Sequence, residues 1–360
     1  MLLGVVAIMV LAISYFILPS LGAMHHQRDQ TNAEVLAQAS AALIGYAASY
    51  RDKHPEQTFG YLPCPDTDND GVTEPSCGKQ GETMIGRLPY STLGLPELRT
   101  ADGECLWYVL SASHKNNPKA TPLNWDTRGL IRVQDNDGTP LIDPSDTNGG
   151  AAAVILSPGT PLAGQKRQAG TQRCGGDASN DLANYLEGNP GGGYTEANTG
   201  ALTIVTGKAN SLTNNDRAAW ISARALFTPI AARSDLLGTL LTQLRSCLDF
   251  TTASNVPTTT ADSRTDVGAK TVAGPGGIEE VMGSKRRNCT LEPPAKETWS
   301  HWKDHFRYAI CNDPSSTCLQ VNSVACSGAL LFGGRAASGN PRTAAEKDSL
   351  SSYFDEGNVL

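Results

Sequence analysis

The first fifty residues constrain the fold of this chain more than any other segment. An apolar run from Leu2 to Met24 is followed by no full charge until Arg28. About 20 apolar residues are enough for a helix to cross a bilayer, so residues 1–24 are predicted to be a transmembrane segment. A cleaved secretory signal has a basic start and a shorter apolar core, and this run has neither. Retention is therefore expected, with cleavage near Gly22 as the alternative.

A second helical pattern follows directly. Within residues 25–58, apolar side chains recur at helical spacing and polar side chains lie off that face. We predict an amphipathic helix that continues the first, giving one helix of about 70 Å at 1.5 Å per residue. Its first half would lie in lipid and its second half against the folded domain. The alternative is a span followed by a separate short helix. The predicted apolar face comprises Val35, Leu36, Ala39, Ala42, Leu43, Tyr46 and Tyr50.

The rest of the chain has the composition of a loop-rich domain with short strands. Glycine (36) and proline (21) are frequent, and aromatic residues make up only 6% of the chain. From Phe59 onward, short apolar pieces alternate with turn residues, which is typical of an antiparallel sheet. The expected fold class is α+β, with a long N-terminal helix, membrane-spanning in its first half, packed on this sheet. The net charge of −7 argues against a nucleic-acid partner, because phosphate contacts need clustered Lys and Arg.

The sequence after the stem divides into three parts. Residues 59–250 are predicted to form the α+β module, and residues 251–290, rich in Thr, Ser, Asp and Gly, a linker or exposed loop. Residues 291–360 are predicted to form a second, smaller module that repeats the first in degenerate form, or the second half of one sheet-based domain. Three segments recur in the same order: Glu104–Ser111 with Asp304–Cys311, Ala151–Gly159 with Ser327–Gly334, and Asp181–Asn189 with Leu350–Asn358.

Nine cysteines without a CxxC pair favour disulfides over a zinc or thioredoxin-like site. An odd number leaves one thiol unpaired or paired between chains. The pairing cannot be deduced from sequence, but Cys64–Cys77 and Cys311–Cys318 are the natural short loops. The cysteines are Cys64, Cys77, Cys105, Cys174, Cys247, Cys289, Cys311, Cys318 and Cys326.

The sharpest local motif is an Asp-rich loop between Cys64 and Cys77. Carboxylates at alternate positions followed by a glycine match the start of a calcium loop. An EF-hand needs Glu at the twelfth position, where this chain has Cys77, so we expect a shorter loop of extracellular type. The alternative is an acidic turn without metal, as we expect for the second run, Asp135–Gly138. The predicted calcium ligands are Asp66, Asp68, Asp70, Val72 (through its carbonyl) and Glu74.

No motif points to catalysis. His301 and His305 lie four positions apart, but Trp302 replaces the Glu of a metalloprotease motif, so structural histidines are expected. The chain has no GxSxG, P-loop or dinucleotide-binding context. Catalytic Ser/His or Cys/His partners can be far apart in sequence, and nothing positive supports such a pair. The protein is therefore predicted to be non-enzymatic.

Six segments carry a family resemblance. LPCPDTDNDG, GRLPYSTLGLP, CLWYVLS, AAAVILSPG, GQKR and NYLEGN follow an Ala-rich helix in that order. As a set they resemble the large pilin-like proteins of proteobacteria, related to type IV pilins and type II secretion pseudopilins. The resemblance covers roughly residues 2–189 and, weakly, the C-terminal module. It implies a shaft built from N-terminal helices that pack on other pilin or pseudopilin subunits. It also implies a single-pass inner-membrane protein whose C-terminal domain lies in the periplasm or on a pilus.

Departures from the family pattern indicate an atypical member. Pro19 matches the helix-kinking proline of pilins, but the basic leader is missing and Leu2 stands where pilins carry a glutamate. Either translation starts a few codons earlier or the mature chain lacks the glutamate, as the tip pseudopilin of type II secretion does. We therefore predict a minor or tip subunit. The alternatives are a membrane-anchored, calcium-dependent adhesin and, less favoured, a secreted hydrolase.

Overall fold

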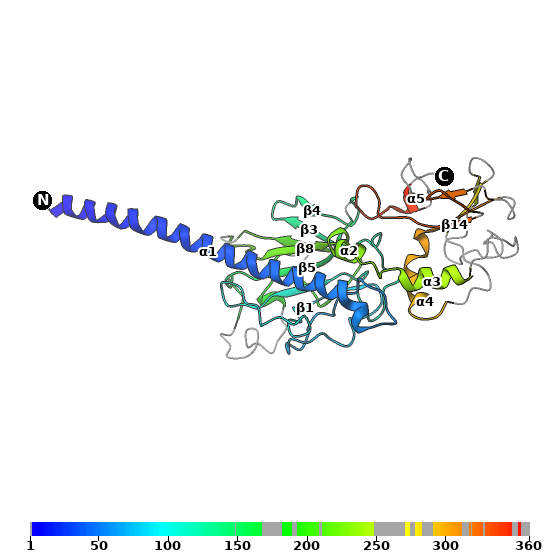
Figure 1. The fold of residues 1–360 in the computed structure, drawn as a ribbon. Coiled ribbons are helices and arrows are strands. Elements are labelled where there is room, and N and C mark those ends of the chain that lie inside the picture. Colours follow the sequence, from blue (N-terminus) through cyan, green and yellow to red (C-terminus); the bar gives the residue numbers. More distant parts are fainter. Residues whose placement is uncertain are drawn as a thin grey trace.

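A single long helix and two β-sheets make up the architecture of the chain. In the computed structural model α1 (Leu2–Lys53) runs without interruption for 52 residues. Its first half extends away from the rest of the molecule and its second half lies across the first sheet (Figure 1). The structure describes residues 2–147 (2–25 as helix backbone only), 149–167, 182–188, 193–208, 211–247, 271–273, 278–282, 291–311, 317, 319–326, 328–347 and 352–353.

The second half of α1 is held by one apolar face. The buried positions recur every three or four residues, as the 3.6-residue period of a helix requires. This pattern confirms most of the predicted apolar face and adds Ala47. Small side chains at two of these positions let the helix backbone approach the sheet closely. The buried residues are Leu36, Ala39, Leu43, Ala47 and Tyr50.

The predicted transmembrane segment is not supported. No helix in the described part of the chain is long and apolar enough to cross a membrane. From His26 onward α1 carries charged side chains, among them Arg28 and Asp29, and its apolar face packs on protein. The prediction of a membrane-spanning stem (residues 1–24), and with it the single-pass inner-membrane localisation, was therefore wrong.

The first sheet has eight strands and curls around β5. That strand pairs with β2 along one edge and with β8 along the other, and its first residue, Ala151, also pairs with Ile131 at the start of β3. The path β4-β3-β5-β2-β1-β6 is antiparallel throughout, whereas β7 pairs with β3 in parallel. The strands are β1 (Glu82–Arg87), β2 (Trp107–Leu110), β3 (Ile131–Asp135), β4 (Pro140–Ile142), β5 (Ala151–Ser157), β6 (Ala197–Thr199), β7 (Leu202–Thr206) and β8 (Arg217–Ser222).

The second sheet lies at the end of the molecule remote from the N-terminus (Figure 1). Its order is β14-β11-β10-β9, and a separate hairpin is formed by β12 and β13. Two of its strands fall within residues 251–290, which the sequence assigns to a linker; the remainder of that segment lies outside the described residues. The strands are β9 (Thr271–Ala273), β10 (Ile278–Met282), β11 (Phe306–Cys311), β12 (Leu319–Val321), β13 (Val324–Cys326) and β14 (Gly328–Phe332).

Two apolar clusters lie on opposite faces of the first sheet. The larger cluster joins the sheet to α1, α2 and α3 and continues to α4 and Phe306 of the second sheet. The smaller one covers the other face around Trp107 and Tyr185. The remaining helices are α2 (Ala223–Ala231), α3 (Gly238–Cys247), α4 (Ala295–Trp302) and α5 (Ala344–Lys347), with 3₁₀ turns η2 (Leu182–Asn184) and η5 (Lys303–His305).

The predicted fold class needs correction on these grounds. The chain is a mixed α/β protein with a curled, largely antiparallel sheet, and it resembles the predicted α+β pilin-like arrangement only loosely. The parallel β3–β7 pair was not foreseen, because strand pairing depends on contacts distant in sequence.

Candidate functional site

The Asp-rich loop is closed by the predicted disulfide. Cys64 and Cys77 are bonded, with their Cα atoms 5.3 Å apart, which confirms this short-loop pairing. Cys105 is also disulfide-bonded. Cys318 lies outside the described residues, so the second short-loop pairing stays a prediction. The disulfide holds both ends of the loop against the buried core, since both cysteines are 1% exposed.

Three of the five predicted ligands come together in this loop. One ligand oxygen from each of Asp66, Asp68 and Glu74 lies within 4.8 Å of the other two. The Asp70 carboxylate instead accepts a hydrogen bond from the Val72 amide at 2.7 Å, and Val72 is 44% exposed. The structure thus gathers the first, third and ninth positions of the motif, and it turns Asp70 to a local backbone contact.

The Asp66 carboxylate keeps acceptor capacity for a cation. The Asp66 oxygens accept backbone N–H groups of Asn69 at 2.6 Å and Gly71 at 2.7 Å. A carboxylate offers about four lone-pair sites, so each oxygen keeps one for a metal. Gly71 has φ +81°, and a Cβ there would meet the Tyr90 ring at 2.4 Å, so the turn requires glycine. Calcium accepts six to eight oxygen ligands, and the three carboxylates fit it without being specific for it.

Burial governs the protonation of this site. It raises the pKa of Asp66 to about 6, although the amides of Gly71 and Asn69 act in the opposite direction. Proton and cation therefore compete for the same carboxylate. Cation binding should weaken below about pH 6.

The two histidines singled out by spacing hold different structural contacts. His301 accepts a hydrogen bond from the Leu123 amide at Nδ1 (2.8 Å), and its Nε2 lies 3.1 Å from Glu297. His305 lies 3.1 Å from Asp126. Both rings are buried, and no cluster of metal-ligating residues in the described ranges includes either ring. Their contacts match the expected structural role.

A Ser–His contact does occur, but its geometry does not support nucleophilic catalysis. Ser113 Oγ lies 2.9 Å from His114 Nδ1 beside a cleft of about 450 Å³. The ring is fully buried, its Nε2 has no hydrogen-bond partner among the described residues, and burial lowers its pKa to about 3. A general base needs an orienting group and a pKa near the working pH. This histidine has neither in the described part of the chain.

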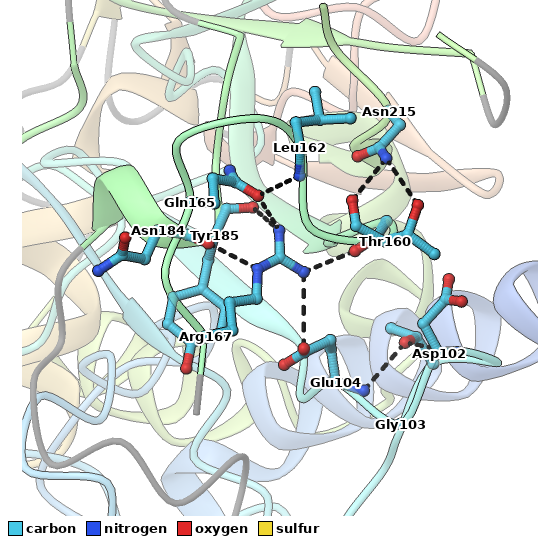
Figure 2. Close-up of polar contacts among 12 residues, drawn as sticks. Asp102, Gly103, Glu104, Thr160, Leu162, Gln165, Arg167, Asn184, Tyr185 and Asn215 are labelled. Carbon is cyan, nitrogen blue, oxygen red and sulfur yellow. Dashed lines mark hydrogen bonds and ion pairs between the residues drawn. The ribbon is translucent and has the colours of Figure 1, made fainter. Parts of the chain in front are cut away.

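A dense polar network surrounds Arg167 (Figure 2). Its guanidinium donates to the carbonyls of Gly159 and Asn184, both at 2.6 Å, and to Gln165 Oε1 at 2.7 Å. It also lies 3.5 Å from Glu104, and its side chain is 3% exposed. Figure 2 shows these groups converging from three separate loops of the first sheet. Arg167 therefore holds together the segments that contain Glu104, Gly159 and Asn184.

A cleft of about 550 Å³ adjoins this network where α1 enters the domain. Arg28, Asp29 and Asn32 of α1 line one wall, and the segment 159–163, which follows β5, lines another. Arg28 pairs with Asp102. Asn215 donates to the Thr160 carbonyl at 2.8 Å (Figure 2). The described lining thus combines cationic, anionic and amide side chains.

Comparison with known protein families, with curated proteins and with solved structures finds no match to this chain.

Sequence reasoning missed the network, although part of its signal was visible. GQKR ends at Arg167 and NYLEGN begins at Asn184, and both segments contribute to the resemblance. Their side-by-side position depends on the fold of the intervening sheet. The cleft residues Arg28 and Asp102 lie 74 positions apart and carry no shared pattern.

Proposed function

We propose that the chain is a non-enzymatic, pilin-like structural subunit, of minor or tip type, that assembles with pilin or pseudopilin subunits through α1. The carrying observation is the division of α1 into a projecting half and a packed half (Figure 1). In Figure 1 no other described element lies beside the projecting half, and packing on the helices of other subunits would cover it.

The outer face of α1 supports the same proposal. Small residues recur every four positions on the side away from the core, and all but the last are exposed. A row at i±4n forms one of the ridges that set helix packing, and small residues make it a shallow groove that a second helix can approach closely. A Cβ added at Gly45 would meet nothing within 4 Å. The row comprises Ala33, Ala37, Ala41, Gly45 and Ser49.

We also propose that calcium stabilises the disulfide-closed loop of this subunit. Asp66, Asp68 and Glu74 support the cation site, and the Cys64–Cys77 bond holds their loop together. Such a site would stiffen a displayed surface and would take no part in a reaction.

Assembly tests the proposal. Ala41→Glu places a charge in the row, and Gln38→Glu places the same charge at an exposed position outside it. We expect Ala41→Glu to abolish incorporation into sheared filaments, scored by immunogold electron microscopy, with an unchanged melting temperature. Gln38→Glu should assemble normally. Equal incorporation of both variants would refute packing through this face of α1.

A further inference from the structure

The arginine of the Figure 2 network has a counterpart in the C-terminal region. Arg167 Nε donates to the Asn184 carbonyl, its Nη1 donates to the Gly159 carbonyl, and its guanidinium lies 5.0 Å from the Tyr185 ring centroid. These contacts join the segment after β5 to η2. We call this arrangement the first clamp.

Arg342 makes the same contacts after β14. Its Nε donates to the Ser352 carbonyl at 2.8 Å and its Nη2 to the Gly334 carbonyl at 2.7 Å. Its guanidinium lies 4.1 Å from the Tyr353 ring centroid. In both cases the arginine lies eight positions after the glycine. The tyrosine directly follows the residue whose carbonyl accepts the Nε hydrogen bond. This is the second clamp.

The clamps fix an alignment between the two regions. Gly334 and Arg342 each lie 175 positions after Gly159 and Arg167. A second glycine pair at this spacing, Gly164 and Gly339, has positive φ in both copies, +96° and +72°. This alignment agrees with the end of the sequence match between Ala151–Gly159 and Ser327–Gly334, because Gly159 and Gly334 are 175 positions apart.

The strand register agrees with this alignment independently. The sequence match of Tyr108 with Tyr308 sets a separation of 200 positions between β2 and β11. Tyr108 pairs with Ile155 across β2 and β5. The spacing of 175 makes Leu330 the counterpart of Ile155, so the alignment requires Tyr308 to pair with Leu330. The structure pairs Tyr308 with Leu330. The outer neighbours also correspond, since β1 flanks β2 as β10 flanks β11.

The burial of corresponding side chains also agrees with this alignment. Ile155 lies in the larger apolar cluster, and its counterpart Leu330 packs against that same cluster. Leu106 and its counterpart Phe306 both belong to it. A one-residue shift would place these side chains on the opposite face of their sheet.

We infer that the chain is a tandem duplication of one sheet module, and that Arg342 of the second copy is a latch which docks that copy on Asp126 of the first. The described parts of residues 82–185 form the first copy, and those of residues 278–353 form the second. This inference does not depend on the proposed role in assembly.

The latch arises from a change of acidic partner. In the first copy Arg167 pairs with Glu104 of its own module and with Glu187, which lies two residues beyond its end. In the second copy Arg342 Nη1 pairs with Asp126 Oδ2 at 2.9 Å, and the Arg342 amide donates to Asp126 Oδ1 at 3.0 Å. Both side chains are 1% exposed.

The surroundings of Asp126 favour a fixed contact. His305 of the second copy lies 3.1 Å from the same Oδ2. Burial raises the pKa of Asp126, but the His305 hydrogen bond and the Arg342 charge outweigh it and lower that pKa to about 2. The carboxylate thus stays ionised. Removing one partner of a buried pair leaves an uncompensated charge and is strongly destabilising.

Hydrogen exchange of the full chain, read by mass spectrometry, tests the latch. In Arg342→Met we expect about 100-fold faster exchange in residues 295–311 and 328–333 and also in residues 119–127 of the first copy. Arg167→Met, the matched variant, should accelerate exchange in residues 159–167 and 182–188 and leave the second copy unchanged. An Arg342→Met effect that does not reach residues 119–127 would overturn the latch.

A double-mutant cycle keeps the test decisive if Arg342→Met folds poorly. Arg342→Lys keeps the charge and loses the bridging geometry, and it should show a smaller effect in the same segments. The double variant with Asp126→Asn should exchange more slowly than the two single effects added together predict. Additive effects would contradict the latch.

Cysteine cross-linking tests the duplication separately. Ala309→Cys should form a disulfide with Ala329→Cys and not with Leu330→Cys, mapped by peptide mass spectrometry. The opposite result would overturn the alignment of the two copies.

Discussion

Replacing Leu43 with alanine tests how α1 is held on the sheet. Leu43 is fully buried in the larger apolar cluster, between Ala39 and Ala47 on the same face. Neither alanine can fill the space left by the lost side chain, and the sheet behind the helix is fixed by its own pairing. Leu→Ala changes in cores cost about 2–5 kcal/mol, rising with the cavity that remains, so we expect roughly 4 kcal/mol here.

That loss is large enough to measure in two ways. At about 2–4 °C per kcal/mol, the melting temperature should fall by roughly 8–16 °C. Urea unfolding followed by far-UV circular dichroism gives the free energy of unfolding directly. Gln38→Ala, at an exposed position of the same helix, is the control and should change stability by no more than about 0.5 kcal/mol. A Leu43→Ala cost below about 1 kcal/mol would refute the packing of α1 described above.

Three further predictions concern the disulfide-closed loop and the buried histidine. Calcium should raise the melting temperature of the full chain and EDTA should lower it; Asp66→Asn should remove this response, whereas Asp137→Asn, in the exposed turn after β3, should keep it. An unchanged melting temperature on EDTA addition would remove the calcium assignment. Replacing Cys64 and Cys77 together with serine should cost about 3 kcal/mol in urea unfolding, as expected for a closed loop of this length, and a cost near zero would contradict it. Burial lowers the pKa of His114 to about 3, so the unfolded chain binds a proton that the folded chain does not, and stability should fall as pH drops from about 6.5 toward 3. His114→Gln should flatten this dependence by up to about 1.4 kcal/mol per pH unit, and parallel curves for the two proteins would contradict the burial of a neutral ring.

Local periodicity predicted the parts of the fold that local physics determines. The helical spacing of Leu36, Ala39 and Leu43 identified the buried face of α1 because one face of a helix repeats every 3.6 residues. The spacing of the Asp-rich loop likewise predicted that carboxylates would lie close together, and Asp66 and Asp68 do so with Glu74. Cys64 and Cys77 were close enough in sequence for their pairing to be foreseen.

Features made by distant segments were beyond that reasoning. The parallel β3–β7 pair and the Arg342–Asp126 contact join segments separated by the fold, and no local pattern encodes them. Hydrophobic content alone misled the prediction of a membrane span, which no helix of the described residues supports. The sequence predicted a degenerate repeat, and the alignment that we infer for its two copies depends on backbone contacts of Arg167 and Arg342 and on strand register.

Site-specific cross-linking from α1 tests the proposed assembly role most directly. A photoreactive amino acid at position 41, in the row of small residues, should cross-link to the N-terminal helix of another pilin-like subunit in intact cells. The same group at position 38, exposed outside that row, should give no such product. Equal products from both positions, or a product at position 41 that contains no helix of another subunit, would contradict the account.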